Sequence, residues 1–521
     1  MNRGLTGSLL VAGTTSDAGK SVLVAGLCRL FARRGISVAP FKAQNMALNA
    51  AVTPEGGEIG RAQAAQAHAA GVEPHVDMNP ILIKPTGERH SQVVVRGKAA
   101  FEAGARDYHG RKKALLPVVA ESFANLENSF DLVIAEGAGG AAEINLRPFD
   151  LTNLGLAREC GLPVVIVCDI DRGGAFAALY GTLALLEPED QALVCGFVIN
   201  RFRGDRAVLD PGIEQLEILT GRPCLGVVPH VEGLMVDAED SLALDRSRPS
   251  TPPLGRDGID VAVVRFPRIS NFTDLDALAA EPGVRVSMTA DPAEVAEADL
   301  VVVPGTKNTV ADLEWMRGLG IDAALEKRAA LGGPILGVCG GYQILGEAID
   351  DDVESGAGLV RGLGLLPVET VFHEEKTLRR HEGRATVLGG PVAGGYSIRH
   401  GRPKRLAGDA WLVDGDGAEE GCVVDAVHGT SWHGLFENDD LRRAFLGEVA
   451  RRRGLDFTPG DVDFARLRSE RVDAFADVLE EHLDTAALEG IISNGPPPDL
   501  PVAPPGGAPL TETLRKQMER D

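Results

Sequence analysis

The sequence predicts an α/β protein of two domains, each built on a mostly parallel sheet with helices on both faces. Short apolar runs of strand type alternate with segments of helical periodicity along most of the chain. The alternation is interrupted near residues 246–253, where proline, serine and arginine gather as in a linker. A chain of 521 residues is also too long for one ordinary core.

The first domain is expected to span residues 1–245 and the second residues 259–490, with a linker at 246–258. Strand candidates of the first domain lie at 8–12, 37–41, 131–135, 163–168, 193–199 and 224–228. Those of the second lie near 261–265, 284–288, 300–303 and 335–338. Beyond about residue 455 the pattern is helical, and Val472, Phe475, Val478 and Leu479 are expected to pack on the second domain. The proline- and glycine-rich residues 491–521 are predicted to form a disordered tail.

A glycine-rich loop follows the first strand candidate. Residues 13–21 read GTTSDAGKS, and a helical segment opens at Lys20. There, backbone N–H groups and the helix dipole face phosphate oxygens, Lys20 reaches the outer phosphates, and the Ser21 hydroxyl can hold Mg²⁺. The expected nucleotide contacts are Gly13, Thr14, Asp17, Gly19, Lys20 and Ser21. Five residues rather than four separate Gly13 from Gly19, which resembles the dethiobiotin synthetase branch of P-loop enzymes; an ordinary strand-to-helix turn is the competing interpretation.

Polar residues at other strand ends extend this predicted nucleotide site, because ligands of open α/β sheets bind there. Glu136 follows the strand at 131–135 and precedes three glycines within four residues, so it is predicted to be a Mg²⁺ ligand rather than a solvated loop acid. Lys42 follows the second strand, and Asn200 ends a later one. We expect Lys42 at this edge of the sheet and Asn200 at the base or ribose.

A second motif, GVCGG at 337–341, lies where an apolar strand meets a helical pattern. Glycine on both sides lets Cys339 occupy a strained strand-to-helix turn. The helix dipole then favours its thiolate, and nearby backbone N–H groups can hold a tetrahedral oxyanion. The base is expected in VHGTSWHGLFE at 427–437, which offers His428 and His433. The other cysteines are interpreted as small buried apolar residues, namely Cys28, Cys160, Cys168, Cys195, Cys224 and Cys422.

Composition narrows the class of protein. Seven cysteines without a CxxC pair argue against a disulfide scaffold or a zinc ribbon and for a reducing compartment. No apolar run approaches a membrane span, and the N-terminus lacks the pattern of a secretory signal. The formal net charge of −23 opposes nonspecific nucleic-acid binding. We therefore expect a cytoplasmic enzyme with no nucleic-acid or membrane partner.

Together these motifs are similar to those of the cobyric acid synthase family, the glutamine-hydrolysing amidotransferases of cobalamin biosynthesis. The resemblance runs from about residue 7 to 485. In the first domain it rests on FKAQNM at 41–46, GRAQAAQ at 60–66, MNPILIKP at 78–85, AEINL at 142–146 and DIDRGG at 169–174. In the second it rests on PGTKNT at 304–309 and HGLFEND at 433–439.

The resemblance implies a dethiobiotin synthetase-like P-loop domain followed by a class I glutamine amidotransferase-like domain. It implies amidation of the b, d, e and g carboxylates of adenosylcobyrinic acid a,c-diamide with ATP, Mg²⁺ and glutamine, and no tightly bound organic cofactor. Its catalytic residues would be Cys339, His433 and Asp150, although helix capping competes as the role of Asp150. Gly305 and Gly340 would contact the oxyanion. Glutamine and the corrinoid are the implied partners, and the oligomeric state stays open.

Two departures from related sequences stand out. Leu435 lies two residues after His433, where most related glutaminases have a carboxylate, so Cys339 and His433 are expected to act as a dyad, as in the corrinoid-amidating branch. Arg399, within GYSIRHG at 395–401, replaces a histidine usual in the family, and this segment is therefore not counted as catalytic.

Two alternatives remain. Cobyrinic acid a,c-diamide synthase performs the same chemistry on other carboxylates, and KAQNM at 42–46 argues against it. A noncatalytic P-loop nucleotide switch with a degenerate glutaminase domain is the other, and the intact Cys339 and His433 argue against that.

Overall fold

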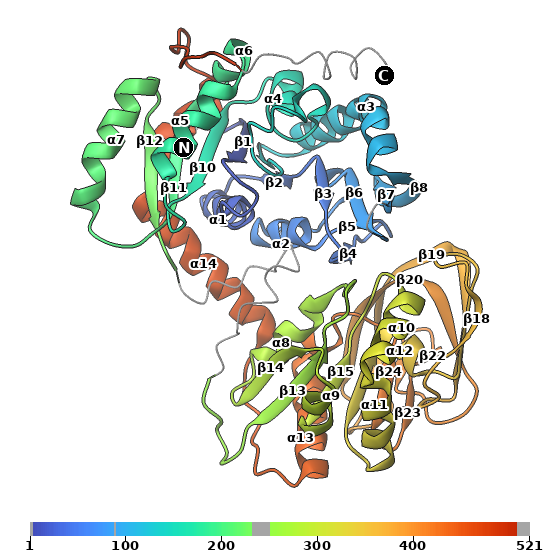
Figure 1. Ribbon diagram of the computed structural model, residues 1–521. Coiled ribbons are helices and arrows are strands. Elements are labelled where there is room, and N and C mark those ends of the chain that lie inside the picture. Colours follow the sequence, from blue (N-terminus) through green and yellow to red (C-terminus); the bar gives the residue numbers. More distant parts are fainter. Residues whose placement is uncertain (1–3, 88–89, 232–250, 508–521) are drawn as a thin grey trace.

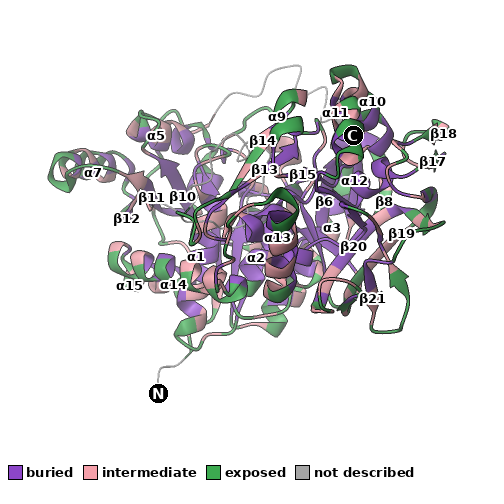
Figure 2. Ribbon diagram, turned by 90° about the horizontal axis from the view of Figure 1, so that it is seen from below, coloured by how far each residue is buried: buried purple, intermediate pink, exposed green. Residues whose placement is uncertain are grey.

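The computed structural model describes residues 4–87, 90–231 and 251–507, which form two α/β bodies (Figure 1). Buried positions concentrate on the strands, and exposed positions concentrate on the helices and loops around them (Figure 2). Residues 251–258 of the predicted linker form no helix or strand, and the rest of that linker lies outside the described residues. Among the described helices none is both long and apolar enough to cross a membrane.

The first domain contains a six-stranded sheet of order β12-β11-β10-β1-β9-β2, and every neighbouring pair is parallel. Its strands are β1 (Gly7–Gly13), β2 (Val38–Phe41), β9 (Leu132–Glu136), β10 (Val164–Asp169), β11 (Val194–Phe202) and β12 (Cys224–Pro229). The predicted strands and their parallel arrangement are confirmed. The helices are α1 (Lys20–Arg33), α2 (Arg61–Ala69), α3 (Ala105–Ser129), α4 (Leu154–Cys160), α5 (Ala175–Leu185), α6 (Pro188–Gln191) and α7 (Arg206–Thr220).

The two faces of this sheet have separate cores, because side chains alternate along each strand. Leu10 of β1 packs in the core that includes α3 and α5, whereas Leu9 and Val11 pack against α1. The chain between β2 and β9 adds a small sheet and a hairpin that the sequence pattern did not predict. These are β3 (Gln44–Met46), β6 (Ile81–Pro85), β7 (His90–Val95) and β8 (Lys98–Gly104), with the hairpin β4 (Ala50–Val52) and β5 (Glu58–Gly60).

The second domain has a six-stranded sheet of order β14-β13-β15-β16-β24-β23, parallel except at β23. Its strands are β13 (Ile259–Val264), β14 (Val284–Thr289), β15 (Leu300–Val303), β16 (Ile335–Val338), β23 (Cys422–Val424) and β24 (Val427–Thr430). Its helices are α8 (Asp276–Ala279), α9 (Pro292–Glu297), α10 (Thr309–Leu319), α11 (Ile321–Ala330), α12 (Gly340–Leu345) and α13 (Asp439–Arg453). A second sheet consists of β17 (Ala348–Asp351), β18 (Gly358–Arg361), β19 (Val368–Ala385), β20 (Val392–Arg405), β21 (Leu412–Asp414) and β22 (Glu419–Glu420).

The C-terminal helices return to the first domain, so the expected packing on the second domain is wrong. Helix α14 (Phe464–His482) runs from the lower body to the upper one (Figure 1). Phe475 and Leu479 enter the core formed with α1, and a Cβ on Gly26 would lie 2.6 Å from both side chains. Helical periodicity identified the apolar face of α14 but carried no information about which surface would cover it.

The prediction of a disordered tail is also wrong for residues 491–507. Helix α15 (Thr485–Asn494) packs on the same core as α14, and residues 495–507 follow it without forming a helix or strand. Gln191 exchanges two hydrogen bonds with the backbone of Ala503, at 3.1 and 2.8 Å, and Ala503 is 2% exposed. A proline-rich segment can thus be ordered when side chains satisfy its few backbone groups. The remainder of the predicted tail, 508–521, lies outside the described residues.

Candidate active sites

The glycine-rich loop joins β1 to α1 and holds Lys20 at its centre. Lys20 is 3% exposed, and its Nζ donates to the carbonyls of Thr15 at 2.8 Å and Gly139 at 3.0 Å. Gly19 has φ 92°, and a Cβ there would lie 2.1 Å from Asn200 Nδ2. Asn200 Nδ2 donates to the carbonyl of Ala18 at 3.0 Å. The fold therefore brings the predicted residue Asn200 directly against the loop.

Glu136 is fully buried beside the loop and collects three donors. Its Oε1 accepts from Ser21 Oγ at 2.7 Å and from Lys42 Nζ at 2.9 Å, and its Oε2 accepts from Gln66 Nε2 at 2.6 Å. Ser21, Lys42 and Glu136, predicted from separate strand ends, thus meet in one place. Gln66 had been noted only within the GRAQAAQ motif.

Oxygen atoms of Ser21 and Glu136 form a donor set that fits Mg²⁺, a hard cation that keeps few protein ligands beside phosphates. Among the described residues no group of three or more His, Cys, Asp or Glu side chains could hold a metal.

Two arginines flank the loop at Asp17: Arg172, which belongs to the DIDRGG motif, and Arg201, which follows Asn200 in β11. Arg172 Nη2 lies 2.6 Å from Asp17 Oδ2, and Arg201 Nη2 lies 3.3 Å from Asp17 Oδ1. Arg201 also pairs with Asp169, at 2.7 Å, across the ends of β10 and β11. Of the other predicted contacts, Thr14 donates its backbone N–H to Val167 within the sheet, at 2.9 Å, and Gly13 ends β1.

Asp150 is held by backbone groups. Its Oδ1 accepts from the N–H groups of Thr152 at 2.9 Å and Asn153 at 3.0 Å, and its Oδ2 accepts from Gly155 N–H at 2.9 Å. These bonds satisfy donors at the start of α4, which is the capping role weighed against catalysis.

Cys339 lies at the sharp turn between β16 and α12. Its backbone has φ 50° and ψ −106°, a conformation that L-residues rarely adopt. Neighbouring glycines permit the turn: a Cβ on Gly341 would lie 1.8 Å from the carbonyl oxygen of Val303, and one on Gly340 would lie 2.7 Å from Thr306 Cγ2. Because Gly340 opens α12, its N–H is among those that an α-helix leaves without an internal partner.

His433 follows β24, the strand next to β16, and is oriented by Asp274. His433 Nδ1 lies 2.7 Å from Asp274 Oδ2, and Gly434 N–H donates to Asp274 Oδ1 at 2.7 Å. Asp274 belongs to the 3-10 helix η4 (Phe272–Leu275). The expected Cys–His dyad is therefore wrong, because a carboxylate does face the histidine from a distant segment. No local motif could have revealed a partner 159 residues away.

The pKa values of Cys339 and His433 are both shifted in the direction that favours a thiolate beside an imidazolium. Burial lowers the pKa of His433, but the charges of Asp274 and Cys339 outweigh it and raise that pKa above its ordinary value. Burial raises the pKa of Cys339, but His433 and Arg399 outweigh it and leave the thiol pKa below its ordinary value. A thiolate beside an imidazolium is the reactive form of such a cysteine.

His428 has a different environment. Its ring packs edge-on against Trp411 and Phe445, and burial lowers its pKa to about 4. Of the two histidines left open by the sequence, His433 is the one that faces Cys339. Its Nε2 is buried and faces the Cys339 thiol, so it is placed for proton transfer at that sulfur.

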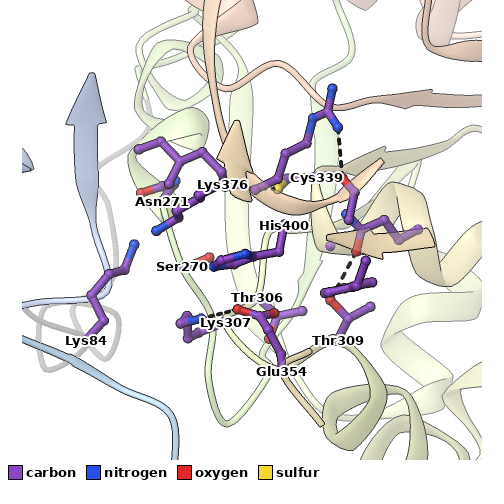
Figure 3. A pocket seen from close by; sticks show the side chains of 16 residues that line it. Lys84, Ser270, Asn271, Thr306, Lys307, Thr309, Cys339, Glu354, Lys376 and His400 are labelled. Carbon is purple, nitrogen blue, oxygen red and sulfur yellow. Dashed lines mark hydrogen bonds and ion pairs between the residues drawn. The ribbon is translucent and has the colours of Figure 1, made fainter. Parts of the chain in front are cut away.

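A small pocket opens at Cys339 (Figure 3). It includes residues of both domains, since Lys84 of β6 lies across from Lys376 of β19. Arg399, excluded from the predicted site, lines it too. Gly305 precedes Thr306, which lines the pocket, and a Cβ on Gly305 would be 3.0 Å from His433 Cε1.

The wall of this pocket is anchored across the domain interface by Glu58 of β5. Glu58 is fully buried, and its two carboxylate oxygens each lie 2.5 Å from a lysine Nζ, Lys84 of the first domain and Lys376 of the second. A further hydrogen bond joins the hairpin to the second domain, since Ala50 N–H donates to Asn271 Oδ1 at 2.8 Å. The hairpin β4–β5 thus fixes the wall of the Cys339 pocket against the first domain.

Replacing Glu58 by Gln is expected to destabilise the protein by about 3 kcal/mol, because two buried ammonium groups lose their counter-charge. Burial already lowers the pKa of Lys376 to about 8. A lysine of lowered pKa releases its proton more readily in the folded state, and a neutral lysine needs no counter-charge. The stability lost in E58Q should therefore shrink as the pH rises. Chemical denaturation of E58Q between pH 7 and 9 measures this.

The matched control is Glu73→Gln, which removes the exposed ion pair between Glu73 and Arg380 across the same interface. It should cost no more than about 0.5 kcal/mol. Equal losses in E58Q and E73Q would contradict an anchoring role for the buried carboxylate.

Replacing Asp274 by Asn is expected to lower the turnover of the Cys339 site roughly 100-fold, since the imidazole ring of His433 loses the group that fixes its tautomer. Asp274 raises the pKa of His433, so the imidazolium of D274N should lose its proton at lower pH than in the wild type. The basic limb of the pH profile then moves to lower pH. An unmoved profile with normal kcat would show that Asp274 only supports the loop.

A nucleotide-loop domain joined to a domain with a Cys–His–Asp site defines a glutamine-dependent amidotransferase. Residues 9–242 match the CobQ/CobB/MinD/ParA nucleotide binding domain, and residues 260–441 match the CobB/CobQ-like glutamine amidotransferase domain. The cobyric acid synthase of Rhodococcus jostii is 55% identical over 500 residues, which cover 95% of this chain and 97% of that one. The enzyme of the same name from Streptomyces coelicolor is 54% identical over 509 residues, covering 96% and 99%. The chain belongs to the cobyric acid synthase family.

Proposed function

We propose that this protein amidates the b, d, e and g carboxylates of adenosylcobyrinic acid a,c-diamide, with ATP and glutamine as co-substrates. The observation that carries the proposal is one chain with two complete sites, Lys20 and Glu136 in the first domain and Cys339, His433 and Asp274 in the second. The names of the relatives support the corrinoid as substrate over a nucleotide switch. All seven cysteines are free, which supports a cytoplasmic setting.

In the first site, a substrate carboxylate oxygen attacks the γ-phosphorus of ATP and ADP leaves, giving an acyl phosphate. Lys20 and Lys42 offset the negative charge on the transferring phosphoryl group. Ser21 and Glu136 would hold Mg²⁺, which supplies further positive charge at the phosphate oxygens. Asn200 supports the nucleotide beside the loop. Asp150, whose carboxylate binds the backbone at the start of α4, would help to position the reacting carboxylate from there.

In the second site, the Cys339 thiolate attacks the glutamine amide carbon. The backbone N–H groups of Gly305 and Gly340 hold the oxyanion, and His433 gives its Nε2 proton to the leaving ammonia. His433 then takes a proton from water, which attacks the thioester and releases glutamate. The ammonia displaces phosphate from the acyl phosphate to form the amide.

Mass spectrometry of adenosylcobyrinic acid a,c-diamide incubated with the protein, Mg²⁺, ATP and glutamine tests the proposal. Four added amides are expected. No addition, with ATP hydrolysis and glutaminase activity intact, would keep the chemistry but assign another substrate. Two amides added to cobyrinic acid itself, with none added to the diamide, would favour the a,c-diamide synthase.

A further inference from the structure

Lys112 of α3 is buried without a counter-charge in contact with it. The residue is 9% exposed, and its Nζ forms no hydrogen bond or ion pair with any residue that the structure describes. Burial lowers the pKa of Lys112, and the charge of Asp150 opposes this effect only in part. An unpaired ammonium group costs free energy when it is buried, so this position indicates an anion that the chain itself does not supply.

The other cations buried in the described part of the first domain have hydrogen-bond partners. Some pair with a carboxylate of the chain, and others donate to backbone carbonyls. The first group is Lys42, Arg61 and Lys84, and the second is Lys20 and Arg222. Among these buried cations, Lys112 alone is left to bind a ligand through a free ammonium group.

Asp150 is the acid whose charge reaches Lys112, but its carboxylate is turned to the backbone. Both of its oxygens accept from N–H groups at the start of α4, and no ion pair joins it to Lys112. Arg147, whose charge also reaches Asp150, is held by Asp190 at 2.7 Å. A ligand carboxylate at Lys112 would therefore displace no existing partner.

A short series of contacts connects Lys112 with the phosphate-binding loop. Lys20 Nζ donates to the carbonyl of Gly139, and Asn153 Nδ2 donates to the neighbouring carbonyl of Ala138 at 2.7 Å. The N–H of Asn153 in turn binds Asp150, next to Lys112. Lys112 thus lies beside the phosphoryl-transfer site but is separated from it by Asn153 and Asp150. A substrate with several carboxylates can reach both places at once.

Exposed apolar side chains adjoin this part of α3. Tyr108, one turn earlier in the helix, donates its hydroxyl to Gln44 Oε1 of β3 at 2.5 Å. Met46 lies on the same face of β3 as Gln44 and is 56% exposed. Leu146 is 37% exposed and precedes the 3-10 helix η2 (Arg147–Phe149), which packs against α3. The surroundings of Lys112 therefore suit a ligand with an apolar body and anionic side chains.

We propose that Lys112 binds a side-chain carboxylate of the corrinoid substrate, other than the carboxylate that reacts, while Met46 and Leu146 contact the apolar ring. This inference rests on the proposed amidation of a corrinoid. The bound carboxylate supplies the counter-charge that the chain does not give to Lys112. A corrinoid held in this way presents a different carboxylate to the phosphoryl group at Lys20. Lys112 is thus a positioning residue that selects a corrinoid with more than one free carboxylate.

The test uses Lys112→Met in the full chain. Equilibrium dialysis without ATP, followed by the visible absorbance of the corrinoid, measures Kd for adenosylcobyrinic acid a,c-diamide and for its methyl ester, which has no charged carboxylate. In K112M the Kd of the diamide should rise about 30-fold, as expected for one lost hydrogen bond between charged groups. The Kd of the ester should not change. In amidation assays KM for the diamide should rise by a similar factor, and kcat should change little.

Lys113→Met is the matched control, because Lys113 is the exposed neighbour of Lys112 on the same helix, and K113M should leave both Kd values unchanged. Lys112→Arg keeps the charge and should recover part of the affinity for the diamide. Thermal unfolding checks that each variant is folded.

Equal affinity for the diamide in wild type and in folded K112M would overturn the inference, and so would an equal loss for the diamide and its ester. A fall in kcat with unchanged KM would also overturn it, because Lys112 would then act on the reacting group. A wild-type protein that neither binds nor amidates the diamide would instead overturn the proposed function.

Discussion

Replacing Cys339 by Ser is expected to abolish the use of glutamine and to leave amidation with free ammonia unchanged. The sulfur lies at the strained turn where its pKa is lowered by the imidazolium of His433 and by Arg399 against the effect of burial. A neutral serine hydroxyl at this position is a far weaker nucleophile than a thiolate, so the covalent glutamyl intermediate would not form. Glutamine-dependent turnover should fall at least about 1,000-fold. Amide counts with glutamine or ammonium chloride as nitrogen source measure the two activities separately.

Cys160→Ser provides the control. Burial raises the pKa of Cys160 to about 12, so its thiol is inert, and its replacement should leave both nitrogen sources usable. Equal loss with glutamine and with ammonia in C339S would overturn the assigned division of labour between the domains.

Replacing Lys20 by Met should have the opposite pattern, with amidation lost for both nitrogen sources and glutaminase activity retained. The ammonium that the loop holds near Thr15 and Gly139 would no longer offset charge on the transferring phosphoryl group. We expect a loss of roughly 100- to 1,000-fold in ATP-dependent turnover, measured as phosphate release with the corrinoid present.

The exposed Lys98 gives a matched lysine-to-methionine change in the same domain, and K98M should keep full activity. Thermal unfolding of K20M shows whether the loop stays folded without its central cation. Full ATP-dependent turnover in a folded K20M would contradict a phosphate-binding role.

The sequence was sufficient for features that depend on local pattern. Buried parallel strands have near-continuous apolar runs, which is why β9 and β10 could be located. Glu136 was found because ligands gather where such strands end. Asp274 was not found, because it meets His433 only through the packing of η4 against the segment after β24. The partner of α14 was missed for the same reason, since an apolar face does not identify the surface that covers it.

The return of α14 and α15 to the first domain also affects the order in which the protein can fold. The second domain is an insertion between β12 and the helices that cover α1, so Leu23, Leu27 and Phe31 stay without part of their core until the last part of the chain is made. Domains usually fold as they leave the ribosome, N-terminal first. Here the domain that begins first is completed last. A fragment that stops at the end of the predicted first domain would expose this apolar face of α1, and an expressed first domain should carry α14 and α15 with it.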